Sequence, residues 1–356
     1  MNIVFDNIIF TLQQTGGIST VWSELLRRAA TDRSIKAVCI DYRNDNVMRC
    51  GLATPPSISL RKRLLERYRL PAYRLTEQSV FHSSYFRILP GAVNITTVHD
   101  LTYHYYRSGA AKAVHLWEEA RALRHSAGII CVSEHTRRDL LSCYPQLDEK
   151  RVRVIYNGVD ERFRRLTDEE QGELPFERGS YALYVGNRQA EYKNYRVAVE
   201  AARRAGLPLV VAGNGLSERE QVYLEAQLGN GWAVVPNATA EELNRLYNGA
   251  FALLYPSDYE GFGLPVVEAQ RAGCPVIAQE SSSIPEAGGE GYLPVEPADR
   301  ETLAEEFSRW LLALKSGQTD RRALTERGMR NAERFSWDKT YRETIGFYQA
   351  TEAMHR

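Results

Sequence analysis

The amino-acid sequence predicts an α/β protein with two domains, each built on a parallel β-sheet covered by helices. The chain has 356 residues, which is too long for one simple core and suits two domains of ordinary size. Short apolar runs, typical of buried strands, alternate with helical patterns. The alternation stops at a polar, charge-rich stretch over 157–179, the expected linker, and then begins again. Two successive series of this kind imply two parallel sheets with right-handed crossovers.

The first half of the chain contains five apolar runs that predict strands. They cover residues 3–10, 36–42, 93–98, 128–132 and 152–156. Apolar residues at helical spacing predict three helices, over 18–29, 112–124 and 134–143. Ser133 is a suitable N-cap for the third of these helices, because its hydroxyl can accept a bond from the first turn.

The second half repeats the alternation with shorter strands. Strands are expected over 181–185, 209–212, 232–236, 251–255, 275–278 and 292–295. Helices are expected over 193–205, 239–248, 265–272, 299–314, 320–335 and 337–350. Thr239 and Glu242 have the spacing of a capping box, and Pro265 suits a first helical position.

Composition excludes several classes of protein. Lys and Arg number 45, as do Asp and Glu, so the net charge is zero, which argues against binding nucleic acid by phosphate neutralisation. The five cysteines are dispersed without a C-x-x-C pair, which indicates free thiols in a reducing compartment. No stretch reaches the ~18 apolar residues of a membrane span. We therefore expect a cytoplasmic protein.

Ligands of parallel sheets bind outside the carboxyl ends of the strands, so two facing sheets would place a cleft between the domains. Gly16 and Gly17 follow the first predicted strand and open a helix. Glycines there allow close approach of a ligand, and the N–H groups of a helix start favour phosphate. A plain tight turn explains the pair equally well. The G-x-G-x-x-G pattern is absent, which argues against an ordinary NAD site.

The segment VHDLTYHYY, residues 98–106, ends a strand on His99 and Asp100. An imidazole at a strand end can hydrogen-bond a sugar hydroxyl or carry a proton. A loop histidine satisfied by the protein itself is the alternative. Asp100, Tyr103 and His104 are candidate contacts to an acceptor substrate.

Two further segments carry chemistry. In YVGNRQAEYKN, residues 184–194, Arg188 and Lys193 follow a strand, and two cations suit a diphosphate, although a solvated basic loop would look the same. In residues 255–278, Gly261 and Gly263 lead into a helix that starts near Leu264. Glu260 and Glu268 flank that helix start, where carboxylates can grip pairs of sugar or ribose hydroxyls beside a phosphate.

The last segment resembles the E-x₇-E signature of retaining glycosyltransferases of family 4. Other matches follow in the family's order: Gly16-Gly17, VHDL, CVSEHT, YNGVD, YVG…KN, EGFGLPVVEA and FSW. The resemblance implies the GT-B fold, with two Rossmann-like domains whose parallel sheets face each other across a cleft. Residues 1–158 with a crossing helix at 337–356 would form the acceptor-side domain, and residues 159–336 the domain that binds the nucleotide sugar.

The resemblance also implies a role for each motif. Gly16 and Gly17 would contact the distal phosphate, and His99 the donor sugar near its C6 hydroxyl. Arg188 and Lys193 would hold the diphosphate, with Asn187 at the position where the family usually has arginine. Four backbone positions and two glutamates would complete the donor site. These are Gly261, Phe262, Gly263 and Leu264 near the sugar and phosphate, Glu260 on the sugar hydroxyls, and Glu268 on the ribose.

The activity implied is transfer of a hexose, mannose for preference, from a nucleotide diphosphate sugar to a glycan or lipid-linked acceptor, with retention at the anomeric carbon. Lipopolysaccharide O-antigen or capsule synthesis is the expected setting. No D-x-D motif ends a strand, so neither a metal ion nor a cofactor is expected. A sugar-nucleotide 2-epimerase and a non-catalytic nucleotide-sugar-binding protein remain alternatives.

One basic segment suggests a partner. Residues 61–74 hold six basic residues and one acid, which suits anionic lipid headgroups at the inner face of the plasma membrane or a lipid pyrophosphate acceptor. A solvated helix face is an equally good explanation.

Overall fold

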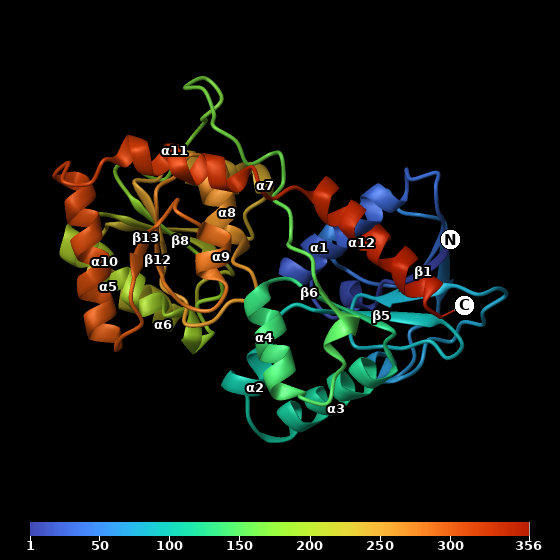
Figure 1. Cartoon of the computed structure of the whole chain (residues 1–356). Coiled ribbons are helices and arrows are strands. Elements are labelled where there is room, and N and C mark those ends of the chain that lie inside the picture. Colours follow the sequence, from blue (N-terminus) through green and yellow to red (C-terminus); the bar gives the residue numbers. More distant parts are fainter. Residues whose placement is uncertain (356) are drawn as a thin grey trace. The chain divides into compact units, whose positions relative to one another are not determined.

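The structure, a computed structural model, describes residues 1–355 and divides into two compact units (Figure 1). The N-terminal unit is Met1–Gly158 together with the C-terminal segment from Trp337, and the C-terminal unit is Val159–Ser336. These are the boundaries given above for the two expected domains. Each unit is built on a single all-parallel sheet, so the α/β class predicted from the sequence is confirmed.

The sheet of the N-terminal unit has the strand order β3-β2-β1-β4-β5-β6-β7. Its strands are β1 (Asn2–Asp6), β2 (Lys36–Tyr42), β3 (Ser57–Leu60), β4 (Val80–Ser83), β5 (Val93–Val98), β6 (Gly128–Cys131) and β7 (Val152–Val154). Its helices are α1 (Gly17–Ala29), α2 (Thr102–Tyr106), α3 (Gly109–His125), α4 (Glu134–Cys143) and α12 (Trp337–Ala353), with short 3₁₀ turns at Ile8–Thr11, Val47–Arg49, Glu66–Tyr68 and Glu149–Arg151.

Alternate residues of β1 enter different cores, as expected for a sheet covered on both faces. Ile3 and Phe5 pack with α1 and α12, whereas Val4 packs with Phe81 on the other face. The helix α12 therefore belongs to the N-terminal unit although it comes last in the chain. Its Tyr348 is buried and hydrogen-bonds with the ring Nδ1 of His82 on β4.

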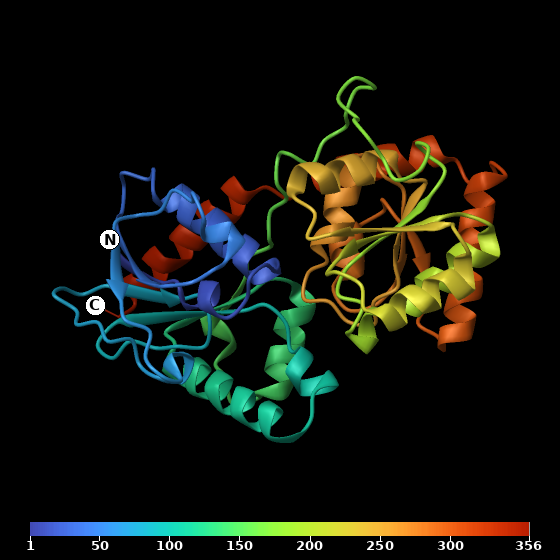
Figure 2. The same ribbon diagram turned by 180° about the vertical axis from the view of Figure 1, so that it is seen from behind.

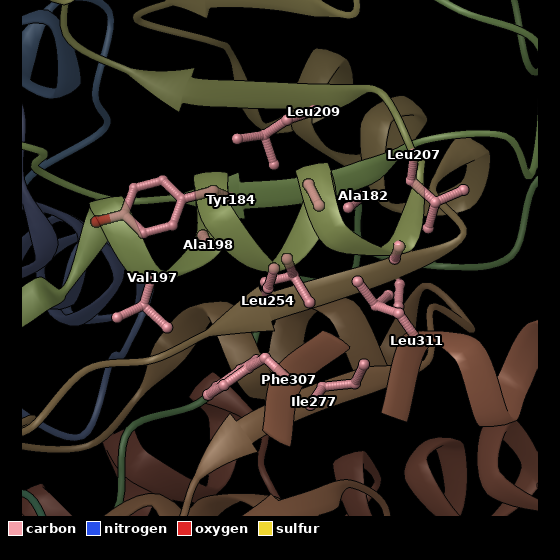
Figure 3. Packing of buried hydrophobic residues seen from close by; sticks show 14 of the residues in the cluster. Ala182, Tyr184, Val197, Ala198, Leu207, Leu209, Leu254, Ile277, Phe307 and Leu311 are labelled. Carbon is pink, nitrogen blue, oxygen red and sulfur yellow. The ribbon is translucent and has the colours of Figure 1, made fainter. Parts of the chain in front are cut away.

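The C-terminal unit has the strand order β10-β9-β8-β11-β12-β13. Its strands are β8 (Ala182–Val185), β9 (Leu209–Gly213), β10 (Trp232–Pro236), β11 (Ala252–Tyr255), β12 (Val276–Gln279) and β13 (Leu293–Val295). Its helices are α5 (Tyr195–Ala205), α6 (Glu218–Leu228), α7 (Ala240–Gly249), α8 (Leu264–Arg271), α9 (Ile284–Gly288), α10 (Arg300–Lys315) and α11 (Arg321–Ala332), with a 3₁₀ turn η5 (Glu191–Lys193). Figure 3 shows its main core, where Leu209 and Leu254 of the sheet pack with Val197 of α5 and Leu311 of α10.

Some sequence predictions were wrong in detail. The first strand ends at Asp6 rather than at residue 10, because the chain turns at Asn7, whose side-chain amide donates to Asp41 (2.8 Å). The strands β3 and β4 and the helices α2, α6 and α9 were not predicted. In β4 a polar pair, His82 and Ser83, interrupts the apolar signal, yet both residues are buried and hydrogen-bonded.

Two boundaries also differ from the predictions. Lys193 lies in the 3₁₀ turn before α5, because Asn194 adopts a left-handed conformation (φ +49°) that separates the two elements. The polar stretch 157–179 is no free linker. Beyond Gly158 it belongs to the C-terminal unit and packs on α7, where the Leu166 N–H donates to Asn248 (2.8 Å) and Gln171 donates to the Arg245 carbonyl (2.8 Å).

Candidate functional site

Glu260 lies in the loop between β11 and α8, and neighbouring serines fix its backbone. Its N–H donates to Ser282 Oγ (2.8 Å), and Ser283 Oγ donates to its carbonyl (2.9 Å). Its carboxylate forms an ion pair with Lys193 Nζ and hydrogen-bonds with Tyr255, at the end of β11. Both side chains of the ion pair are mostly buried. The sequence predicted both residues, and the structure brings them into contact.

Asn194 explains how Lys193 reaches Glu260. Its side-chain amide donates to Asp258 (2.6 Å) and to the Pro256 carbonyl (3.0 Å). These bonds tie the turn after β8 to the loop after β11. Because β8 and β11 are neighbours in the sheet, the carboxyl ends of both strands contribute to one cluster.

Glu268 lies on α8 and accepts a hydrogen bond from the Tyr247 hydroxyl of α7 (3.0 Å). Burial raises the pKa of this carboxyl to about 7, and the nearby charge of Asp160 adds to the rise. Glu268 therefore changes its charge within the neutral pH range. A carboxylate accepts hydrogen bonds from a diol most strongly when it is ionised.

The helix α8 starts without a side-chain cap. Its N-cap Gly263 has a φ of +94°, and a Cβ there would lie 2.8 Å from Ile284 Cδ1, so glycine is required. By contrast, α6 and α7 both begin with complete capping boxes. The first N–H groups of α8, from Leu264 onward, receive no cap from the N-cap side chain and suit an anionic ligand. The ring of Phe262 is buried and packs on Phe335 (centroids 5.3 Å apart). We therefore expect Phe262 to contact a ligand through its backbone and not through its ring.

Arg188 is held by contacts to the region between β9 and α6. Its side chain is only 2% exposed, and its guanidinium pairs with Glu220 (2.9 Å) at the start of α6. It also donates to the Gly215 carbonyl (2.8 Å). Of the two cations predicted to share a diphosphate, Lys193 is the one beside Glu260, and Arg188 braces the turn between β9 and α6. The preceding Asn187 is exposed.

The two glycines at the start of α1, Gly16 and Gly17, differ in the space that surrounds them. Gly16 is the N-cap of α1, with φ +157°, and a Cβ there would lie 2.4 Å from Gln13 Oε1. At Gly17 a Cβ would meet no atom within 4 Å. The fold therefore requires the first glycine, whereas the second leaves open space at the start of a helix that has no side-chain cap.

His99 follows β5 and lines a cavity of about 30 Å³ in the N-terminal unit, together with Thr97, Asn157 and Trp337. Burial lowers the pKa of the His99 ring to about 4, so the ring is neutral at pH 7. A neutral imidazole can donate one hydrogen bond and accept another, which suits a hydroxyl group. His82 lies close enough to interact with His99 electrostatically.

The three candidate acceptor contacts are engaged within their own unit. Asp100 accepts from the Thr102 N–H (2.9 Å) and so starts α2. The Tyr103 ring stacks on His115 of α3 (centroids 3.7 Å apart), and the Nε2 atom of His104 lies 2.6 Å from Glu119. These contacts hold α2 against α3.

Sequence reasoning missed several residues that hold the candidate side chains of the C-terminal unit in place. They are Asn194, Glu220, Tyr247, Tyr255, Asp258 and Ser282. Tyr247 and Tyr255 read as core residues in an apolar pattern, and nothing local indicates where their hydroxyls point. The Ser281–Ser283 triplet was a visible signal, since three serines after a buried strand suit a loop that caps another loop. Among the described residues, no group of three His, Cys, Asp or Glu side chains is arranged to hold a metal ion.

Both halves of the chain match models of known protein families. Residues 15–163 match the family model of Glycosyltransferase Family 4, and residues 167–328 match that of Glycosyl transferases group 1. The O-antigen chain mannosyltransferase B of Escherichia coli is 33% identical over 183 residues, which are 48% of this chain and 45% of that protein. The O-antigen chain mannosyltransferase RfbU of Salmonella typhimurium is 27% identical over 230 residues, which are 62% and 59% of the two chains. The matches thus span about half the length of these curated relatives.

The solved structures show the fold. The Anabaena protein HepE, crystallised with UDP and glucose, aligns with a TM-score of 0.75 over 98% of this chain and 100% of its own, at 15% identity. At that identity the likeness concerns architecture alone. From the two family models together with this architecture, we conclude that the chain belongs to glycosyltransferase family 4, the group 1 glycosyl transferases with the two-domain GT-B fold.

Proposed function

We propose that this chain is a retaining glycosyltransferase. It moves a hexose, mannose for preference, from a nucleotide diphosphate sugar to a glycan or lipid-linked acceptor in the synthesis of O-antigen or capsule. Two relatives are named as O-antigen mannosyltransferases, which supports this hexose and this setting. HepE binds UDP and glucose, so the screen below includes both uracil and guanine nucleotides.

One observation carries the proposal. Lys193, Glu260, Glu268 and the start of α8 all follow the adjacent strands β8 and β11 or lie on the helix after them. A cation and a helix start suit a diphosphate, and two carboxylates suit the hydroxyls of a sugar and a ribose.

The chemistry follows from where charge develops. Cleavage of the anomeric C–O bond leaves negative charge on the diphosphate and positive charge on the sugar. Lys193 and the N-terminus of α8 stabilise the first charge, and the Glu260 carboxylate holds the sugar hydroxyls beside the second. In the N-terminal unit, His99 is neutral at pH 7, so its ring can hydrogen-bond a substrate hydroxyl rather than act as a cation. The acceptor attacks the face that the diphosphate leaves, and the leaving phosphate takes the acceptor proton.

We further propose that the enzyme works in the cytoplasm without a cofactor or a bound metal ion. Lys193 and the start of α8 supply the counter-charge that a divalent cation would otherwise give. The basic residues of segment 61–74 contact anionic headgroups at the inner face of the plasma membrane. No helix among the described residues is long and apolar enough to cross a membrane.

The test begins with the donor. Thermal unfolding is measured with GDP, UDP, ADP and dTDP, since a nucleotide that binds only the folded state raises the Tm by ~2–4 °C at 100 times its Kd. The matching radiolabelled sugar nucleotide is then incubated with and without a polyprenyl-linked oligosaccharide. Transfer to the oligosaccharide supports the proposal, and the anomeric configuration of the product shows retention or inversion.

Each alternative has its own outcome in this assay. A new sugar nucleotide formed without any acceptor would indicate an epimerase. Nucleotide binding without turnover of any donor and acceptor would indicate a non-catalytic binding protein. We expect the transfer rate to be unchanged by EDTA, and a loss of activity restored by Mg²⁺ would contradict the proposed metal independence.

A further inference from the structure

The cavity beside His99 is lined by a polar group that the protein itself does not satisfy. Trp337, the first residue of α12, is 5% exposed and lines this cavity of about 30 Å³. Its indole Nε1–H is buried and has no hydrogen-bond partner within the described chain. An indole can only donate, and a buried donor without a partner costs free energy, so an acceptor is needed near this N–H group.

A second hydrogen-bond donor reaches the cavity through Tyr348, His82 and Thr97. Tyr348 is fully buried, and the ring Nδ1 atom of His82 is the one partner of its hydroxyl among residues 1–355, so the hydroxyl donates to Nδ1. Burial lowers the pKa of His82 to about 3, so this ring is neutral and carries its proton on Nε2. The Nε2–H group donates to Thr97 Oγ1 (2.9 Å), which leaves the hydrogen of the Thr97 hydroxyl for a further acceptor.

Thr97 and His99 are two residues apart, at the end of β5 and just after it, so they share one face of the sheet. Ile95, the preceding residue of the same face, packs with α1 and α12. Figure 2 shows the red α12 against the blue part of this unit that contains α1. Thr97 and His99 both line the cavity, together with the buried Asn157, whose amide can donate and accept.

The cavity is suited to water in both size and chemistry. One water molecule needs ~10–15 Å³ and about three polar partners. The volume of about 30 Å³ meets the first requirement. Trp337, Thr97, Asn157 and His99 meet the second, since two of them offer hydrogens and two can accept.

We propose that an ordered water molecule in this cavity fixes which nitrogen of the His99 ring carries the proton. The water accepts from the Trp337 N–H and the Thr97 hydroxyl, and it donates to Asn157 Oδ1 and to the cavity-facing nitrogen of His99. That nitrogen then has no proton, so the neutral ring carries it on the other nitrogen. Trp337, Thr97 and Asn157 are thus positioning residues for His99.

The consequence for catalysis rests on the proposed function, whereas the water site does not. With its tautomer fixed in this way, His99 offers an N–H donor to a substrate hydroxyl at all times. A ring that exchanged between tautomers would offer an acceptor there for part of the time.

Histidine tautomers are measured by long-range ¹H–¹⁵N NMR of the full chain labelled at histidine, without nucleotide or acceptor. A ring nitrogen without a proton resonates far downfield of a protonated one, and a His99→Gln variant identifies the signals of His99. We expect a single tautomer. A crystal structure checks the water directly, and a protein atom in place of water at the Trp337 N–H would overturn the proposal.

Trp337→Phe removes the N–H group and keeps an aromatic ring. The His99 signals should move toward a mixture of both tautomers. Trp310→Phe is the matched control, because it removes an indole N–H in the C-terminal unit, where Trp310 donates to the Pro294 carbonyl (2.9 Å). It should leave the His99 signals unchanged. Far-UV circular dichroism and the Tm check folding, and Asn157→Leu replaces Trp337→Phe if that variant does not fold.

Thr97→Val and Thr97→Ser form a second pair. The valine variant removes the hydroxyl and should mix the tautomers, whereas the serine variant keeps the hydroxyl and should restore the single tautomer. Unchanged His99 signals in both Trp337→Phe and Thr97→Val would overturn the proposal. A change in Thr97→Val alone would also overturn it, because Thr97 would then act on His99 without the water.

A transfer assay connects the water site to the proposed function. Trp337→Phe should lower kcat/KM ~5-fold, the effect of one hydrogen bond, while calorimetry shows an unchanged Kd for the nucleoside diphosphate. Coupled His99 signals in a chain that transfers no sugar would refute the proposed function alone. Normal transfer in a chain whose His99 signals ignore Trp337 would refute the water site alone.

Discussion

Lys193 and Glu260 neutralise each other in the structure, although the proposed mechanism needs both charges for the donor. The ion pair holds each side chain where the ligand will need it, which reduces the ordering cost of binding. A diphosphate arriving at Lys193 adds a second anion to the same cation. Glu260 keeps the Tyr255 hydrogen bond and can then turn its other oxygen to a hydroxyl.

Lys193→Met tests this assignment. We expect transfer to fall ~10²–10³-fold, because the leaving diphosphate loses a preorganised cation. Lys315→Met, at an exposed lysine at the end of α10, is the matched control and should leave the rate unchanged. Steady-state transfer rates measure both variants. A Lys193→Met enzyme with normal kcat/KM would remove this residue from the mechanism.

The variant Glu268→Gln should change nucleotide binding and thermal stability in opposite directions. The folded-state pKa of about 7 lies above the ordinary value of 4.5, so the folded chain holds a proton that the unfolded chain releases between these pH values. This group therefore costs stability as the pH rises to 7. At pH 8 the Gln variant should unfold ~2–4 °C higher yet bind nucleotide more weakly.

The pH dependence of the unchanged enzyme gives a second readout for Glu268. Nucleotide affinity should improve from pH 6 to pH 8 as the carboxyl ionises, and the Gln variant should lose this dependence. Calorimetric titration at both pH values measures it. A flat affinity profile in the unchanged protein would argue that Glu268 does not hold the ribose.

The sequence predicted a residue of the candidate site only where the type of the residue and its position in the chain both indicated a role in binding. Lys193, Glu260 and Glu268 stand out because they are charged and lie in, or soon after, the glycine-containing segments that join a buried strand to the next helix. Arg188 was assigned to the same ligand by the same reasoning, but Glu220, 32 residues later, takes its guanidinium. No pattern in the chain indicates that pairing, because it depends on the turn between β9 and α6.

At the scale of elements, helix starts divide into capped and uncapped ones. The helices α10 and α11 begin with aspartate caps, and α1 begins with glycine. A side-chain cap would occupy the N–H groups that an anion needs.

Gly16→Ala and Gly17→Ala form a matched pair at the start of α1. The first should lower the Tm, because the new Cβ meets Gln13 at 2.4 Å in a backbone conformation that disfavours alanine, at a cost of ~1 kcal/mol. The second should leave the Tm unchanged, since its Cβ enters open space, but should weaken binding of the intact sugar nucleotide. If Gly17→Ala binds the donor normally, this helix start has no phosphate role.

The elements themselves were largely predictable, and the exceptions share one cause. Strands such as 36–42 and 93–98 were predicted with the bounds that the structure has. The strand β4 and the helix α6 were missed because their local patterns are weak, and α3 was predicted without the buried charges of its inner face. Burial of Glu118 and Glu119 depends on partners from distant segments, such as Arg67 and Tyr144, that local periodicity does not reveal.

For the whole molecule, the two units should respond differently to acid. Burial lowers the pKa of His82 to about 3 and that of His99 to about 4, against an ordinary value of 6.5. Stability from these neutral rings is fully present above pH 6.5 and is lost as the pH falls toward 3–4. Both histidines lie in the N-terminal unit, whereas protonation of Glu268 favours the folded C-terminal unit.

Hydrogen exchange of the full chain at pH 7 and pH 5 measures this difference. We expect the N-terminal unit to lose protection first, with His82 alone contributing about 2 kcal/mol at pH 5. His82→Gln should flatten the pH dependence, while His125→Gln, at an exposed histidine, should not. Equal loss of protection in both units would contradict the assignment.

The burial of Tyr348 beside His82 also bears on how the protein is made. A ribosome delivers residues 1–158 first, but the core that they form lacks α12 until Tyr348 has been synthesised. At ~5–20 residues per second, that wait is roughly 10–40 s. The domain that emerges first is therefore the last to be completed, and a released chain that ends before residue 337 would carry a complete C-terminal unit and an N-terminal unit without α12.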